Sequence, residues 1–79
     1  MNENFLKTVS FELKRIRDEK KYTLSQVSMG TGYSKQLLSR YENGKPIDLK
    51  IFLNLLDFYN VRADIFFEKV YAYAYIKTN

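Results

Sequence analysis

Apolar and polar residues alternate along most of the chain with the period of an α-helix. In residues 5–21 apolar side chains recur every three or four positions, and the same spacing returns in residues 49–59. Two shorter helices are predicted between these segments, and a fifth helix begins near Ala63. The pattern therefore predicts an all-α fold, a compact domain of five helices. In the fourth helix the residues expected to face inward are Leu49, Phe52, Leu53, Leu56 and Tyr59.

Capping residues mark where the two short helices begin and end. Thr23, with Gln26 three positions later, predicts a capping box at the start of the second helix, and Ser34 is placed to cap the third. Gly32 lies between them and suits the left-handed conformation that ends a helix. We therefore expect two short helices joined by a tight turn, a pair that lays its second helix against another surface.

The end of the chain allows two interpretations. Residues 70–76, VYAYAYI, alternate small-aliphatic and tyrosine side chains with period two, which is typical of a strand that pairs with its copy across a dimer axis. As a helix, the same residues extend the fifth helix. In both cases the tyrosines favour self-association. We expect a helix-turn-helix domain over residues 1–69 and a dimerisation tail over residues 70–79. The residues expected at the dimer interface are Phe66, Tyr71, Tyr73 and Tyr75.

Composition excludes several classes of function. The 79 residues include no cysteine and no histidine, so no disulfide or thiolate metal site can form, and the carboxylates show no evident catalytic pair. We expect neither an enzyme nor a metal or cofactor site. A chain of this length builds only a small core, which dimerisation would help to stabilise. No secretory signal and no membrane-spanning run is visible, so a cytoplasmic protein is expected.

Positive charge is concentrated in the N-terminal part of the chain. Residues 1–50 carry ten Lys and Arg against six Asp and Glu, whereas residues 51–79 carry three of each, for a net charge of +4. The N-terminal part is therefore the part suited to a polyanion. On the third helix, four polar residues lie opposite the inward-facing Leu38 and Tyr41, and their side-chain types hydrogen-bond to base edges in the major groove of DNA. These four are Lys35, Gln36, Ser39 and Arg40.

At this point residues 13–67 resemble the Cro/C1-type (XRE) helix-turn-helix domain of phage repressors. The resemblance rests on residues 14–20 (KRIRDEK), 22–23 (YT), 32–34 (GYS), 39–44 (SRYENG) and 60–61 (NV). Within the family, residues 9–11 (VSF) and 66–68 (FFE) are most similar to small controller proteins of restriction–modification systems.

The resemblance implies a homodimeric, sequence-specific regulator of transcription that binds a pseudo-palindromic operator in double-stranded DNA. In the family, the positions of Lys35, Gln36, Ser39 and Arg40 contact bases, and those of Thr23, Asn43 and Lys45 meet the phosphate backbone. Arg17 and Glu42 match a pair that forms a largely buried ion pair in some phage repressors.

Two leucines depart from the family pattern. Leu24 stands where many relatives have glutamine, and Leu37 replaces a small polar residue on the third helix. Leu37 would either meet a thymine methyl group or shift the helix in the groove. A second hypothesis for function keeps the fold and makes the protein an antitoxin or adaptor whose aromatic tail binds a protein partner. No membrane and no small-molecule ligand is expected.

Overall fold

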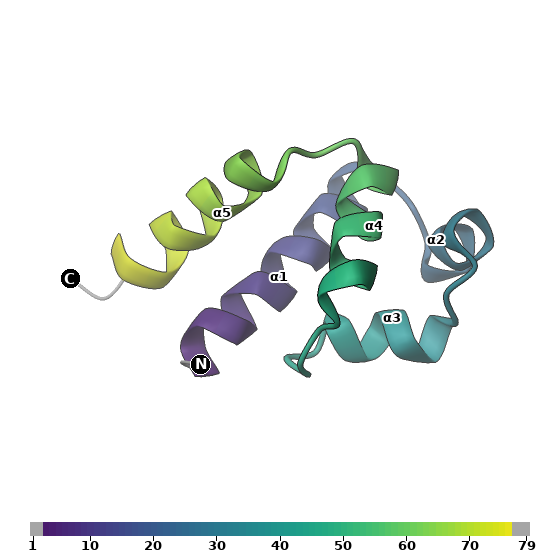
Figure 1. The fold of residues 1–79 in the computed structure, drawn as a ribbon, viewed down its shortest axis with the longest axis horizontal. Helices are drawn as coiled ribbons and strands as arrows, with labels where there is room; N and C mark the ends of the chain where they lie inside the picture. Colours follow the sequence, from purple (N-terminus) through teal and green to yellow (C-terminus); the bar gives the residue numbers. More distant parts are fainter. Residues whose placement is uncertain (1–2, 77–79) are drawn as a thin grey trace.

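Five α-helices follow one another in the computed structural model, which describes residues 3–76 (Figure 1). They are α1 (Glu3–Glu19), α2 (Leu24–Thr31), α3 (Lys35–Tyr41), α4 (Leu49–Tyr59) and α5 (Ala63–Tyr71). A short π-helix, η1 (Ala72–Ile76), continues α5. The prediction of an all-α fold is confirmed. The described part of the tail is helical, so the strand interpretation is wrong there, and residues 77–79 of the predicted tail lie outside the described residues.

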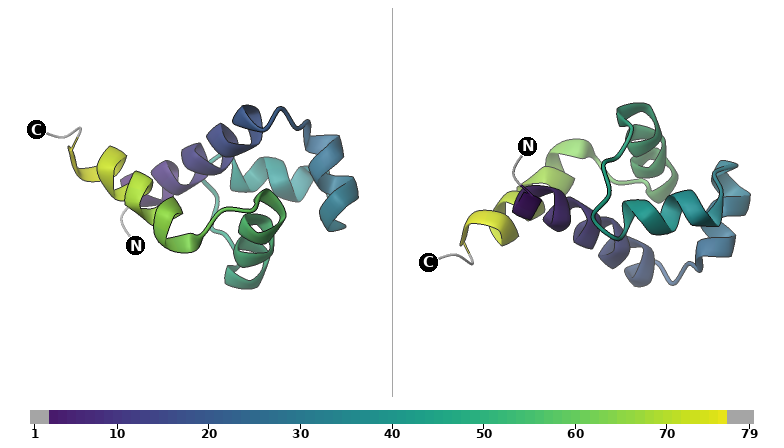
Figure 2. Two further views of the ribbon diagram at one scale, coloured as in Figure 1. Left: turned by 90° about the horizontal axis from the view of Figure 1, so that it is seen from above. Right: turned by 90° about the horizontal axis from the view of Figure 1, so that it is seen from below.

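The helices are arranged along an axis of 40 Å, about twice the 21 Å width of the described part of the chain. α1 and α5 lie side by side, and α2 and α3 form the end of the molecule opposite η1 (Figures 1 and 2). α4 stands between these two parts. The helix-turn-helix pair and the aromatic tail are therefore at opposite ends of the long axis.

The core is built from one face of each helix. Its buried hydrophobic residues are Val9, Leu13, Ile16, Val27, Leu38, Tyr41, Phe52, Leu55, Leu56, Tyr59, Phe66 and Val70. Phe66 is fully buried and packs edge-on against Phe52, with ring centroids 5.1 Å apart. Because Phe66 has no exposed surface, its assignment to the dimer interface is wrong. Val70 is also fully buried, so the first residue of the predicted tail belongs to the core of the domain.

The buried face of α4 differs from the predicted stripe. Leu49 and Leu53 are 69% and 47% exposed, whereas Leu55 is 2% exposed. The buried face runs through residues 52, 55, 56 and 59, which has the i, i+3, i+4, i+7 spacing of a helix packed along one side. Both stripes fit the apolar pattern of this leucine-rich segment, and contacts with the other helices select between them.

The predicted caps form as hydrogen-bonded structures. The Gln26 amide donates to Thr23 Oγ1 at 3.1 Å, and the Thr23 amide donates to Gln26 Oε1 at 2.8 Å, which completes the capping box. Ser34 and Asp48 cap α3 and α4 in the same way, each accepting from the amide three residues later. Gly32 ends α2 with a φ of 84°, in the left-handed region that favours glycine.

Gly30 allows α2 to approach α4 closely. A Cβ added at this position would lie 2.4 Å from Cε1 of Phe58, which is closer than real contacts allow. The Phe58 ring therefore occupies the space that any side chain at position 30 would need. The apolar pattern of the chain offers no reason for a glycine inside α2, because the reason lies in a residue of another helix.

We predict that Gly30→Ala destabilises the fold by about 1–2 kcal/mol. Alanine favours a helix by about 1 kcal/mol, but the displacement of the Phe58 ring costs more than that gain. The measurement is urea unfolding of the single variant and of the variant in a Phe58→Leu background. With the ring removed, Gly30→Ala should become neutral or stabilising, and an equal loss in both backgrounds would contradict this explanation.

Candidate nucleic-acid interface

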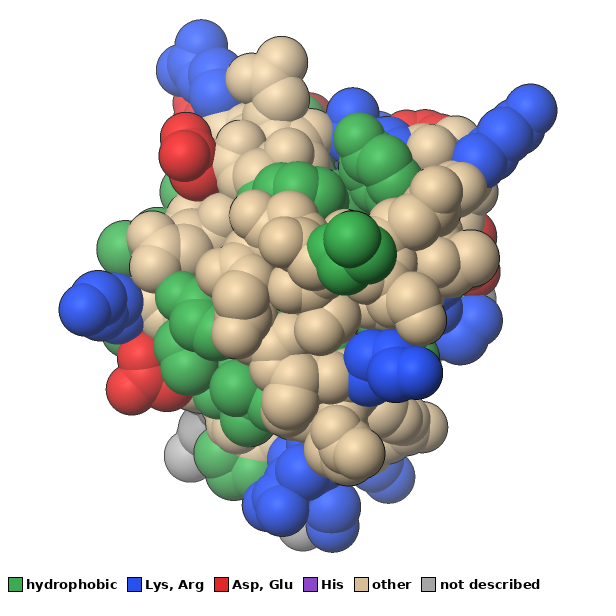
Figure 3. Space-filling view, turned by 90° about the vertical axis from the view of Figure 1, so that its right-hand side faces the viewer, with side chains coloured by type: hydrophobic (Ala, Val, Ile, Leu, Met, Phe, Trp, Pro, Cys, Tyr) green, Lys and Arg blue, Asp and Glu red, His purple; other side chains and the backbone are tan. Residues whose placement is uncertain are grey.

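The outward face of α3 carries the four polar residues expected to contact bases. Leu38 and Tyr41 are buried and fasten α3 to the core. Lys35, Gln36 and Arg40 are exposed and Ser39 is partly exposed on the opposite side of the helix. The structure therefore brings the four predicted base contacts together on one face. Figure 3 shows this end of the molecule, where Lys and Arg side chains stand out around a surface formed mostly by uncharged groups.

The two leucines that depart from the family pattern pack inward. Leu24 and Leu37 are both partly buried, and both pack against the hydrophobic core. On a helix, position 37 lies one turn before the buried position 41 and on the side away from positions 35 and 39. Leu37 therefore contributes to the attachment of α3, and a contact with a thymine methyl group is not needed to explain it.

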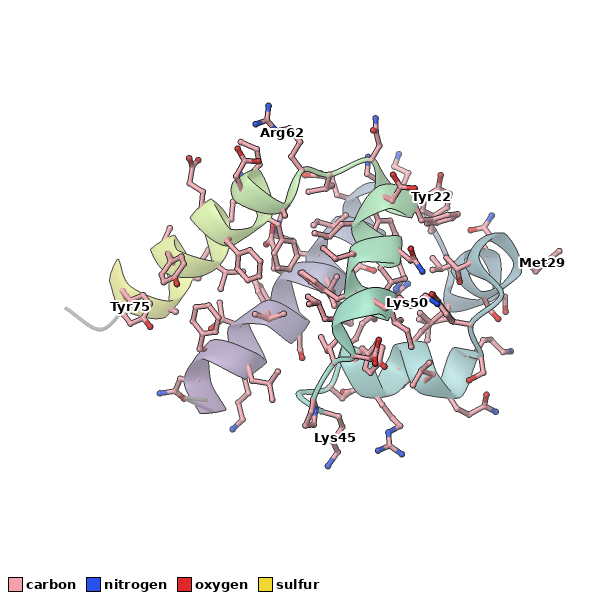
Figure 4. The ribbon with its side chains drawn as sticks, viewed as in Figure 1. Tyr22, Met29, Lys45, Lys50, Arg62 and Tyr75 are labelled. Atoms are coloured by element: carbon pink, nitrogen blue, oxygen red, sulfur yellow. The ribbon has the colours of Figure 1, made fainter. Side chains whose placement is uncertain are left out.

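The residues expected at the phosphate backbone lie at the two ends of the helix pair. Thr23 is exposed at the start of α2. Asn43 follows α3, and its side-chain amide donates to the Ser39 carbonyl oxygen at 2.6 Å. Lys45 is exposed and projects away from the body of the molecule (Figure 4). The structure thus brings Asn43 and Lys45 together after α3 and places Thr23 apart from them.

A two-pronged ion pair joins α1 to the end of α3. Arg17 Nε and Nη2 donate to the carboxylate oxygens of Glu42 at 2.8 Å and 3.0 Å, and Arg17 Nη1 donates to the Tyr22 carbonyl oxygen at 2.8 Å. The side chains of Arg17 and Glu42 are only 12% and 7% exposed. The hydrogen bonds to Glu42 raise the pKa of the Arg17 guanidinium above its usual value. Since Glu42 is the C-cap residue of α3, this pair holds the end of α3 against α1.

Burial also changes the ionisation of a neighbouring tyrosine. Tyr59 is 2% exposed, and burial, followed by the negative charge of Glu42, raises the pKa of its hydroxyl. A tyrosine hydroxyl is protonated at neutral pH in any case, and this shift keeps it protonated further into the alkaline range. This keeps the space around the Arg17–Glu42 pair free of a second anion.

A second ion pair, which the sequence did not suggest, is buried on α1. Glu12 is fully buried, and its carboxylate accepts from Arg15 Nε at 2.7 Å and from Arg15 Nη2 at 2.8 Å. The hydrogen bonds to Glu12 raise the pKa of Arg15 above its usual value. The spacing of three positions on one helix was the available signal. The apolar stripe gave no indication that position 12 is buried.

The cations near α3 differ in their partners from three of the cations on α1. On α1, Lys14, Arg15 and Arg17 all form salt bridges with carboxylates. Among the described residues, no salt bridge engages Lys35, Arg40 or Lys45. The positive charges around α3 are therefore available to an external anion. The described residues contain no cluster of three or more His, Cys, Asp or Glu side chains that could hold a metal ion, and no helix long and apolar enough to cross a membrane.

The tyrosines expected at a dimer interface lie on α5 and η1. Tyr71 and Tyr75 are 53% and 51% exposed, with their rings stacked at a centroid distance of 5.4 Å. Tyr73 is 37% exposed and its ring meets Phe11 of α1 edge-on. Phe11, which lies off the apolar stripe of α1, thus packs sideways against η1. Each of these rings keeps part of its surface open to solvent.

Comparison with protein-family models gives one match. A model described as helix-turn-helix matches residues 13–66, from the second half of α1 to the middle of α5. Searches of curated proteins and of solved structures returned no match.

We predict that Glu42→Gln lowers the free energy of unfolding by about 2–4 kcal/mol. The substitution keeps the shape of the side chain but leaves the Arg17 guanidinium buried without its counter-charge. Urea unfolding is the measurement, and Asp64→Asn is the matched control, because it removes the carboxylate of the exposed Arg62–Asp64 pair. Asp64→Asn should leave the free energy of unfolding nearly unchanged. Equal effects of the two substitutions would show that the Arg17–Glu42 pair does not hold α3.

Proposed function

The chain belongs to the Cro/C1-type (XRE) helix-turn-helix family of DNA-binding transcription regulators, and we propose that it binds a pseudo-palindromic operator in double-stranded DNA as a homodimer. The observation that carries the proposal is the outward face of α3. It presents Lys35, Gln36, Ser39 and Arg40, and no carboxylate pairs with its cations among the described residues. The resemblance of residues 9–11 and 66–68 to restriction–modification controller proteins suggests that role within the family.

The side chains of this face match the donors and acceptors of the major groove. Lys35 and Arg40 suit guanine O6 and N7, and Gln36 suits adenine N6 and N7. Ser39 donates to or accepts from either kind of base. Thr23, Asn43 and Lys45 flank the face and would hold the phosphate backbone on either side of the groove, which orients α3 without adding sequence preference.

Two copies are needed for useful selectivity. Four base-contacting residues specify only a few base pairs, and a second copy doubles that number. The exposed Tyr71, Tyr73 and Tyr75 support a dimer interface on α5 and η1, because aromatic side chains are enriched in such interfaces. The same tyrosines would serve the alternative function, an antitoxin or adaptor that binds a protein partner through its tail.

The arrangement of the helices connects the interface to the operator. The tail and α3 lie at opposite ends of a 40 Å axis (Figure 1). Half-sites one helical turn apart have centres separated by about 34 Å. A dimer whose half-sites lie about 10 bp apart must therefore place its protomers side by side. A dimer joined end to end through the tails requires half-sites whose centres are about two turns of DNA apart. Selection of the operator from random DNA measures this spacing directly.

We predict that Arg40→Ala weakens binding to the selected operator by about 1–3 kcal/mol and relaxes the preference for one base pair in each half-site. Fluorescence anisotropy with operator and scrambled DNA is the measurement. Arg62→Ala, which removes an arginine on the opposite side of the molecule, is the control and should bind as the wild type does (Figure 4). Equal weakening on both DNAs would rule out a base contact by Arg40.

We predict that Tyr71→Ser combined with Tyr75→Ser shifts the dimer toward monomer by at least tenfold in dissociation constant, because aromatic contact area is lost. Analytical ultracentrifugation of the full chain is the measurement. Substitutions are preferable to truncation, since removal of residues from position 69 onward would delete the buried Val70. Met29→Ser is the control, because Met29 is an 87% exposed apolar residue of α2. An unchanged dimer would exclude these two tyrosines from the interface.

A further inference from the structure

The second turn of α1 is tied to the turn that follows α3. Ser10 is 2% exposed, and its Oγ accepts a hydrogen bond from the Gly44 amide at 3.1 Å. Gly44 has a φ of 87°, so the chain turns sharply here, directly before Lys45. This hydrogen bond joins residues 34 positions apart in the sequence. The Ser10–Gly44 hydrogen bond therefore fixes α1 against the turn that follows α3.

Lys7 lies one helical turn before Ser10 and beside this turn. A Cβ at Gly44 would have Lys7 Cγ as its nearest neighbour, at 3.6 Å. The aliphatic stem of Lys7 therefore runs along the Gly44 backbone, while the side chain as a whole is exposed. Lys45, the residue after Gly44, projects from the same turn (Figure 4). Two lysines from segments far apart in the sequence thus flank one glycine.

Neither of these two positive charges is engaged by a carboxylate among the described residues. The acidic residue of α1 nearest to Lys7 in the sequence is Glu3, four positions before it, and Glu12, Asp18 and Glu19 each form a salt bridge with another cation of α1. Glu42, at the end of α3, is held by Arg17. Among the described residues, neither Lys7 nor Lys45 forms a salt bridge. Two lysines beside one turn, each without a salt bridge, favour binding of an anion there.

We propose that Lys7 binds the DNA phosphate backbone together with Lys45, on the strand that borders the groove entered by α3. The proposal rests on the proposed function and adds to it a contact from α1. Lys45 follows α3 by four residues, so an anion at the Gly44 turn lies next to any DNA that α3 enters. Lys7 precedes residue 13, where the match to the family model begins, so the family match does not cover this lysine.

The test is the salt dependence of binding by Lys7→Gln. Each lost phosphate contact lowers the slope of log K against log salt concentration by about 0.9, and weakens binding about fivefold at 0.15 M salt. We expect this loss for each protomer, both on the selected operator and on unrelated DNA. The ratio of the two binding constants should stay unchanged. Lys7→Arg should keep the wild-type slope. Lys69→Gln, an exposed lysine on α5, is the control for net charge alone and should also keep it.

The outcomes separate this inference from the proposed function. If the wild type binds its operator specifically and Lys7→Gln keeps the wild-type slope, the inference is overturned and the proposed function stands. The same holds if Lys69→Gln lowers the slope as much as Lys7→Gln does, since the effect is then one of net charge. If the wild type shows no preference for any selected DNA, the proposed function fails and the inference fails with it. Circular dichroism of Lys7→Gln checks that α1 is intact.

Discussion

The ion pair between Arg17 and Glu42 connects the helix-turn-helix pair to the rest of the molecule. One guanidinium donates to the carboxylate of Glu42, the C-cap residue of α3, and also to the carbonyl oxygen of Tyr22, in the link between α1 and α2. Three segments are therefore oriented by one side chain that is only 12% exposed. A largely buried charge pair of this geometry tolerates little movement, because any separation leaves an unpaired charge away from water. The position of α3 relative to α1 depends on this constraint.

The same pairing decides which charges remain available at the surface. Glu42 is the only carboxylate on α3 or in the turn after it, and Arg17 neutralises it. On α1, Glu12, Asp18 and Glu19 are likewise engaged by cations of that helix. The positive charges near α3 therefore face solvent without internal partners among the described residues. A net charge of +4 is small, but its distribution leaves a cationic surface around α3 that is suited to DNA.

The other end of the molecule is organised by aromatic packing. Phe66 and Phe52 meet in the core, while Phe5 packs against Tyr71 of the tail, with ring centroids 5.3 Å apart. The start of α1 is thus joined to α5 and η1 by rings, as its middle is joined to the turn after α3 by the Ser10–Gly44 hydrogen bond. α1 therefore contacts both ends of the domain and links the tail to the turn that follows α3.

The sequence by itself determined the helices, their caps and the outward face of α3. These features are local: capping residues bind amides three positions away, and the helical period places positions 35, 36, 39 and 40 on one side. The helix-turn-helix family was also evident from short runs of residues. The Arg17–Glu42 pair was available only by resemblance, since nothing within either helix connects residues 25 positions apart.

Only the tertiary structure decided which apolar and charged residues are buried. The pattern of α4 fitted two faces, and packing selected the one with Leu55 over the one with Leu49 and Leu53. Packing also placed Phe66 in the core and not at a dimer interface, buried Glu12, and made Gly30 necessary through the ring of Phe58. Each of these outcomes depends on a side chain from a different helix. Periodicity describes one helix at a time, so it carries no information about what lies opposite.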